Sequence, residues 1–394
     1  MDYDTPFFFR VKRLMTDNST ERLPISVLTG FLGSGKTTLL RELLMHPAMG
    51  ETAVIINEFG DVALDHLLVR TASEDMLVLN SGCLCCTVRS DLVDALRDLY
   101  LKRVRGEVPQ FKRVVIETTG LADPAPVLHT LMNDPPVAAR FRLDGVIATI
   151  DAANGARQLD EHMESVKQAA MADRLLLTKK DIAKPDAVRA LEARLHRLNP
   201  GAPIHAVAHG KIDPDRLFDA GLYDPKTKTA DVRRWLQAEA YEQRGAEAKH
   251  DDHHDHERHG HDHGRDHDHH GHEKPDVNRH DARIRAFCLN HDRPMLWESL
   301  ANWVDMLLAA HGDALLRLKG IVNVAGEDKP VVIHGVQHVF HPPAMLDAWP
   351  SDDRRTRIVL IARDLDPDTV ETLFKSVACV APAEAAGIEK VERL

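Results

Sequence analysis

A glycine-rich run at residues 30–38, Gly-Phe-Leu-Gly-Ser-Gly-Lys-Thr-Thr, has the residue types of a phosphate-binding loop. Glycines lack a Cβ atom, so several backbone N–H groups can converge on a phosphate, and a lysine follows them. The spacing of Gly30, Gly35, Lys36 and Thr37 is that of a P-loop. We expect Lys36 to contact the β- and γ-phosphates and Thr37 to hold Mg²⁺. The predicted nucleotide ligands in this loop are Gly30, Gly33, Ser34, Gly35, Lys36, Thr37 and Thr38.

A carboxylate that could partner this loop is Glu117, which follows the apolar run Arg113–Ile116. In proteins that hydrolyse nucleotides, an acid at the end of such a strand supports Mg²⁺ through water. Gly120 lies three residues further on, and we expect its N–H to face the γ-phosphate. The predicted catalytic residues are Lys36, Thr37 and Glu117.

Three thiols stand close together in Asn-Ser-Gly-Cys-Leu-Cys-Cys-Thr, at Cys83, Cys85 and Cys86. Thiolates suit a borderline metal such as Zn²⁺, and in an extended segment Cys83 and Cys85 can point the same way. Four-coordination needs further ligands, and Glu58 and Asp61 are candidates. The predicted metal residues are therefore Cys83, Cys85, Cys86, Glu58 and Asp61. Buried structural cysteines or a redox thiol are the alternatives.

A base-reading segment is indicated by Thr-Lys-Lys-Asp at residues 178–181. An aspartate there can accept hydrogen bonds from guanine N1–H and N2–H₂, which adenine does not offer. The lysine stem can lie over the base. We therefore predict that Lys179 and Asp181 bind guanine, which makes the nucleotide GTP.

The elements that must position these residues are short strands separated by helical patterns over residues 23–210. The strand runs are apolar on both faces, as in a parallel sheet covered by helices, where ligands bind at the carboxyl ends of strands. The predicted strands are Ile25–Leu28, Ala53–Ile56, Met76–Leu79, Arg113–Ile116, Gly145–Ile150, Arg174–Leu177 and Ile204–Val207. We assign residues 1–22 to a mobile tail and 23–223 to an α/β P-loop domain.

A composition change marks residues 224–281 as a linker that is partly helical and then rich in histidine. Residues 250–272 hold eleven histidines interleaved with acids, and almost no apolar residues. Such a segment cannot bury a core, so we expect it to be disordered, although neutral imidazoles bind Zn²⁺ and related ions. A solvated linker and a metal buffer are the alternatives.

A second, α+β domain is expected over residues 282–394. Its pattern predicts helices at Pro294–His311 and Asp366–Val377, and strands at Arg283–Leu289, Leu315–Val324, Val331–Val336, His338–Phe340 and Arg357–Arg363. We interpret Cys288 and Cys379 as core cysteines. His334, His338 and His341 fit interface or polar-face positions better than a metal site.

Length and composition agree with two domains, because 394 residues exceed one ordinary core. The net charge of −11 argues against nucleic acid as a partner, and no stretch approaches the roughly 20 apolar residues of a membrane span. The N-terminal residues lack the pattern of a signal peptide. Five cysteines, three of them crowded together, suggest reduced thiols in a cytoplasmic protein. A monomer and a homodimer both remain open.

Taken in order, these motifs resemble those of the CobW-type metallochaperone GTPases, relatives of UreG and HypB. The resemblance covers residues 24–210, and residues 281–380 are similar in kind to the CobW C-terminal domain. It implies GTP hydrolysis coupled to delivery of zinc, or Co²⁺, to a client apo-metalloprotein. An activator of one cobalt enzyme or of cobalamin synthesis is an alternative of the same kind. Departures from the family pattern are Thr178 for Asn, and Asp61 where Glu is common.

Overall fold

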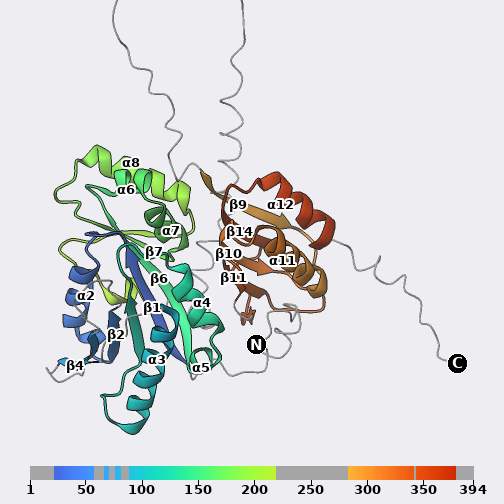
Figure 1. Cartoon of the computed structure of the whole chain (residues 1–394). Coiled ribbons are helices and arrows are strands. Elements are labelled where there is room, and N and C mark those ends of the chain that lie inside the picture. The colour runs from blue at the N-terminus through green and yellow to red at the C-terminus, as the bar shows by residue number, and fades with distance from the viewer. Residues whose placement is uncertain are drawn as a thin grey trace, which may run out of the picture.

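Two β-sheets organise the chain, one in each half of the sequence, and they lie side by side (Figure 1). The computed structural model describes residues 22–56, 66–70, 76–80, 88–218, 283–340 and 343–378; for 66–70, 76–80 and 88–91 it describes the backbone. The expected mobile tail and the histidine-rich segment lie outside these residues. No helix in the described part of the chain has the length and apolarity needed to span a bilayer.

The first sheet has the strand order β4-β3-β2-β5-β1-β6-β7-β8. The strands from β2 to β8 in this order pair in parallel, whereas β3 is antiparallel to both β2 and β4. All seven predicted strands are present, but the β3 strand was not predicted. The strands are β1 (Leu23–Gly30), β2 (Thr52–Ile56), β3 (His66–Arg70), β4 (Met76–Asn80), β5 (Arg113–Glu117), β6 (Phe141–Asp151), β7 (Arg174–Thr178) and β8 (Ile204–Ala206).

Helices cover both faces of this sheet, as the two-faced apolar strands predict. Val27 and Leu28 of β1 are adjacent in sequence, yet they belong to two different hydrophobic clusters on opposite faces. Each is essentially fully buried, which stabilises the fold by about 1.5–3 kcal/mol per side chain. The helices are α2 (Lys36–Met45), α3 (Val88–Arg105), α4 (Ala125–Asn133), α5 (Pro135–Ala138), α6 (Gly155–Glu161), α7 (Met163–Met171) and α8 (Pro185–Leu198).

The second sheet is antiparallel, in the order β12-β11-β10-β14-β9, with β13 paired to β11. Two helices cover one of its faces, and Trp303 of the first packs edge-on against Phe374, with ring centroids 5.0 Å apart. The predicted small α+β domain is therefore present. Its elements are β9 (Ile284–His291), α11 (Trp297–His311), β10 (Leu315–Val322), β11 (Val331–Val336), β12 (Val339–Phe340), β13 (Ala344–Met345), β14 (Thr356–Arg363) and α12 (Pro367–Leu373).

Three details of this domain differ from the sequence-based expectation. Helix α11 begins at Trp297 rather than Pro294, because Met295 pairs with Val324 and keeps the chain extended up to that point. Helix α12 ends at Leu373 and continues as a π turn to Ala378. Cys288 is partly buried at the edge of a small cluster, not in the core.

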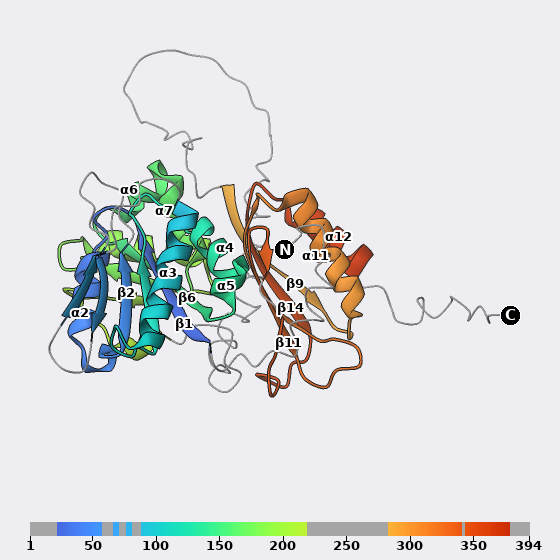
Figure 2. The same ribbon diagram turned by 60° about the horizontal axis from the view of Figure 1, so that its bottom comes forward.

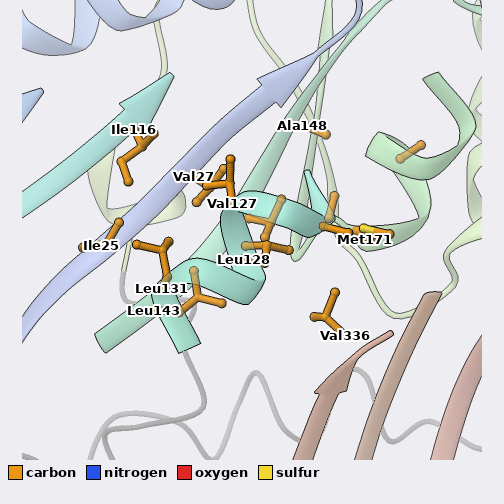
Figure 3. Close-up of a cluster of buried hydrophobic side chains, with 14 of the residues drawn as sticks. Ile25, Val27, Ile116, Val127, Leu128, Leu131, Leu143, Ala148, Met171 and Val336 are labelled. Carbon is orange, nitrogen blue, oxygen red and sulfur yellow. The ribbon is translucent and has the colours of Figure 1, made fainter. Parts of the chain in front are cut away.

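The other face of the second sheet packs against the first domain. Helices α4, α7 and α8 contact strands β9 to β12, and Val336 of β11 belongs to the same buried cluster as Leu128 of α4 (Figures 2 and 3). A ring nitrogen of His129 on α4 lies 3.2 Å from the carbonyl oxygen of Val336. Apolar packing and a side-chain contact therefore join the two domains.

A buried ion cluster crosses the same interface. Asp173, in the turn after α7, accepts two hydrogen bonds from Nη2 of Arg317, at 2.7 and 2.9 Å, and one from Lys319; both cations stand on β10. Burial alone would raise the pKa of Asp173, but the charges of Arg317 and Lys319 hold it far below 3.8. Burial lowers the pKa of Lys319 to about 8; the Asp173 carboxylate opposes this shift, and the charge of Arg317 adds to it.

Replacing this carboxylate should destabilise the protein strongly. Asp173→Asn leaves two buried cations without an anion, so we expect the free energy of unfolding in urea to fall by about 3–5 kcal/mol at neutral pH. Because the folded-state pKa is lowered, the contribution of Asp173 is complete above 3.8 and is lost as the pH falls through the folded-state value. The difference between variant and wild type should therefore shrink in acid. Asp186→Asn, at an exposed aspartate, is the control; equal stability of the two variants would contradict the role of the cluster.

Candidate nucleotide-binding and metal-binding site

The P-loop lies between the end of β1 and the start of α2, as predicted. Gly30 has φ = 140°, and a Cβ atom built there would come within 2.3 Å of Oγ1 of Thr149, so no other residue fits. Gly35 caps α2 with φ = 95°, in the left-handed region. Ser34 Oγ lies 2.6 Å from Oγ1 of Thr149 on the neighbouring strand β6. The loop is thus fixed to the sheet on both sides of its turn.

Lys36 is buried beneath the loop, where its ammonium group donates to the carbonyl oxygens of Gly30, at 2.8 Å, and of Phe31, at 3.2 Å. Its stem rises from the first residue of α2, and the helix N-terminus adds partial positive charge. A phosphate oxygen carries negative charge, whereas a carbonyl oxygen is neutral, so the ammonium attracts the phosphate more strongly. The ammonium is therefore well placed to prefer phosphate oxygens to loop carbonyls.

Thr37 and Glu117 meet at the base of the loop. The Thr37 hydroxyl donates to Oε1 of Glu117 at 2.8 Å, and Glu117 is 4% exposed. Strand β5 pairs in parallel with β1, in register Leu28 with Glu117, which brings the acid to the same sheet edge as the P-loop. A hydroxyl and a carboxylate in contact are oxygen ligands of the kind that Mg²⁺ prefers, so these residues fit that ion.

The segment after β5 packs directly on the P-loop. The backbone N–H of Thr118 donates to the carbonyl oxygen of Leu28 at 2.9 Å. A Cβ atom at Gly120 would lie 2.6–2.8 Å from atoms of Leu32, so the absence of a side chain permits this close approach. Sequence reasoning placed Gly120 beside the phosphates, and the structure brings it against the loop that would hold them.

Thr178, the first residue of Thr-Lys-Lys-Asp, contacts the P-loop, which the sequence motif alone does not predict. Its hydroxyl lies 2.8 Å from the carbonyl oxygen of Ser34 and 3.1 Å from that of Ile150. The hydroxyl therefore links the end of β7 to the P-loop. The segment that we expect to bind the base is held at the loop that we expect to bind the phosphates.

Asp151 is a site residue that sequence reasoning missed. It accepts a hydrogen bond from Nζ of Lys179 at 2.9 Å and others from the backbone N–H groups of Ala153 and Asn154. Burial would raise the pKa of Asp151, but these hydrogen bonds, led by the one from Lys179, lower it overall. The available signal was its position directly after a buried strand, the feature that identified Glu117. Asp181, in contrast, is exposed at the turn that follows.

The predicted metal residues, Glu58, Asp61, Cys83, Cys85 and Cys86, lie outside the described residues. The strands that precede them are described. Strand β3 is antiparallel to both β2 and β4, so β2 and β4 run in the same direction and end at the same sheet edge as the P-loop. Within the described part of the chain, no cluster of His, Cys, Asp and Glu could hold a metal.

Comparison with known protein families gives two matches in order along the chain. Residues 24–206 match the CobW/HypB/UreG nucleotide-binding domain, and residues 284–378 match the C-terminal domain of the cobalamin synthesis protein CobW. These matches coincide with the two sheets and their covering helices.

Individual relatives match over nearly the whole chain. The zinc chaperone YjiA of Escherichia coli (strain K12) is 31% identical over 353 residues, which cover 89% of this chain and 98% of YjiA. The zinc chaperone CobW of Pseudomonas aeruginosa is 30% identical over 389 residues, covering 94% and 96%. The crystal structure of the Zn(II)-bound YjiA GTPase from E. coli superposes with a TM-score of 0.62 at 27% identity, covering 90% and 99%. The chain therefore belongs to the CobW/HypB/UreG family, with a CobW C-terminal domain.

Proposed function

We propose that this protein hydrolyses GTP and uses the nucleotide cycle to carry zinc to a client apo-metalloprotein in the cytoplasm. The observation that carries the proposal is the convergence of Lys36, Thr37, Glu117 and Gly120 at one edge of the first sheet. Lys36 and Thr37 come from the P-loop, and Glu117 and Gly120 come from the end of the adjacent strand and the loop after it. Relatives that match nearly the whole chain are named zinc chaperones, and one is named a GTPase.

Each of these residues has a role in the proposed hydrolysis. The P-loop amides and Lys36 bind the β- and γ-phosphates and offset the negative charge that develops on them. Thr37 and Glu117 would hold Mg²⁺, which supplies further neutralisation of the phosphate charge when it is bound. The N–H of Gly120 orients the γ-phosphoryl group. The chain thus contributes positioning and electrostatic stabilisation rather than a covalent intermediate.

Base selection falls to the turn after β7. Asp181 accepts from guanine N1–H and N2–H₂, and the stem of Lys179 lies along the base. The Lys179–Asp151 ion pair supports this arrangement, because it fixes a lysine whose backbone is left-handed at φ = 55°. The hydroxyl of Thr178 ties this turn to the P-loop in place of the commoner asparagine.

Zinc is the cargo, and we assign it to Cys83 and Cys85 with Glu58 or Asp61 as an additional ligand. The segments that carry these residues follow β4 and β2, which end at the same sheet edge, two strand spacings or roughly 10 Å apart. That edge also holds the P-loop and Glu117. The thiolates and the carboxylates can therefore approach one another beside the phosphates, which gives the nucleotide a route to change the metal geometry.

Lys36→Ala should abolish most of the hydrolysis. The variant loses the main cation that contacts the transferred phosphoryl group, so we expect kcat for GTP to fall by about 100-fold or more. Phosphate release under saturating GTP measures the effect. Arg41→Ala, at an exposed position on the same helix, should retain wild-type turnover. Wild-type turnover in the Lys36 variant would show that the P-loop does not serve hydrolysis.

Asp181→Ala should weaken GTP binding selectively. Guanine loses its carboxylate partner and adenine loses nothing, so GTP affinity should fall by about 10- to 150-fold while ATP affinity stays the same. Titration with fluorescent analogues of both nucleotides tests this. Asp186→Ala removes another exposed aspartate of the same region and is the control. Equal losses for the two nucleotides would exclude Asp181 as the base-reading residue.

A further inference from the structure

Helix α7 contacts the loop after β5 through one buried amide. The side chain of Gln168 is fully buried, and its Nε2 donates to the carbonyl oxygens of Gly120, at 3.2 Å, and Ala122, at 2.9 Å. Both acceptors belong to the loop that packs on the P-loop. One side chain thus uses both of its N–H groups on two alternate peptides of the same turn.

These hydrogen bonds help to set the direction in which the N–H of Gly120 points. A trans peptide is planar, with its C=O and N–H pointing in opposite directions, so whatever holds the carbonyl of Thr119 also directs the N–H of Gly120. That carbonyl accepts from the backbone N–H of Ala122 at 3.2 Å and from the Thr118 hydroxyl at 3.3 Å. Gln168 bonds the carbonyls of Gly120, inside this turn, and of Ala122, at its end, and it thereby holds the turn in place.

Helix α7 is itself held at several points along its length. At its N-terminal end, the ring of His162 stacks on Phe31 of the P-loop, with ring centroids 4.5 Å apart and an interplanar angle of 24°. Nζ of Lys167 bonds the carboxylate of Asp123 at 2.5 Å. Beyond the C-terminal end, Asp173 is bound by Arg317 and Lys319 of the second domain. Helix α7, which carries Gln168, therefore contacts both the P-loop and the second domain.

We propose that Gln168 is a positioning residue for GTP hydrolysis, which holds the turn at residues 118–123 so that the N–H of Gly120 faces the γ-phosphate. This inference rests on the proposed GTPase function. The position requires a neutral side chain with two donors. A glutamate would place a carboxylate against two carbonyl oxygens, and a methionine of similar length would offer them no hydrogen at all.

Two substitutions test the proposal, Gln168→Glu and Gln168→Met. Of the three phosphates of GTP, the N–H of Gly120 would contact the γ-phosphate alone. Each variant should therefore bind a non-hydrolysable GTP analogue more weakly and lower kcat, by about 100-fold for a misplaced group. The affinity for GDP should remain that of the wild type. Burial raises the pKa of a carboxyl group, so kcat of Gln168→Glu relative to wild type should rise as the pH falls and the acid regains a donor. Packing damage alone would produce neither the GTP-selective loss nor this pH dependence.

Gln158→Glu on α6 is the matched control, since it makes the same change at another largely buried amide. Among the described residues, the side chain of Gln158 makes no hydrogen bond to the loop after β5. It should behave as wild type. Equal losses of GDP and GTP-analogue affinity in both Gln168 variants, or no loss at all, would overturn the proposal. If Gln168→Glu does not fold, Gln168→Met decides the question. Absence of GTP hydrolysis by the wild type would instead reject the proposed function, so the two failures are distinguishable.

Discussion

The parallel alignment of β1 between β5 and β6 is the constraint on which the rest of the site depends. Its register places Leu28 opposite Glu117 and Gly30 opposite Thr149. The P-loop, Glu117 and Thr149 therefore meet at one sheet edge, at the ends of three neighbouring strands. Because both faces of these strands are buried in separate hydrophobic clusters, a shift of one residue would exchange the faces of every side chain. The contact of Thr37 with Glu117 and the close approach of Gly30 to Thr149 are consequences of that register.

The second domain supports this site indirectly, through helices of the first domain. Its sheet covers α4, which follows the loop after β5, and α7, whose Gln168 bonds that loop. The interface combines apolar packing around Val336 with the buried carboxylate of Asp173, which faces two cations. Removing one partner of a buried ion cluster is costly, so these charges favour one arrangement of the two domains over others. The nucleotide loops and the second domain therefore share a common support in α7.

Local sequence signals were sufficient to predict the position of residues that follow the strands of the parallel sheet. The P-loop, Glu117 and Gly120 follow buried strands, and the ends of parallel strands meet whatever their separation in sequence. The same signal was present at Asp151 and was overlooked. The β3 strand escaped prediction although its apolar run, Leu67–Val69, is as long as that of the predicted strand β5; it forms a hairpin with β4 near one edge of the sheet.

Gln168 and Asp173 carried no local signal, because their partners are remote in the sequence. Gln168 contacts residues 46 and 48 positions away, and Asp173 contacts residues 144 and 146 positions away. Aspartate is a residue type that is almost never fully buried unless it is paired, so its position in the sequence does not predict burial. The burial of Asp173 combines a hydrogen bond from the backbone N–H of Val146 on β6 with the docking of the second domain, and pattern and propensity do not specify that docking.

The most direct test of the account is whether zinc and the nucleotide are coupled. Zn²⁺ affinity is measured by competition with a chromophoric chelator, in the presence of Mg²⁺ with either GDP or a non-hydrolysable GTP analogue. If the thiolates and an acidic ligand share the sheet edge with the γ-phosphate, the two affinities should differ by about 5- to 150-fold, and Cys83→Ser or Cys85→Ser should remove both the tight site and the difference. Identical Zn²⁺ affinities in the two nucleotide states would contradict nucleotide-dependent zinc transfer, even if the protein binds both ligands well.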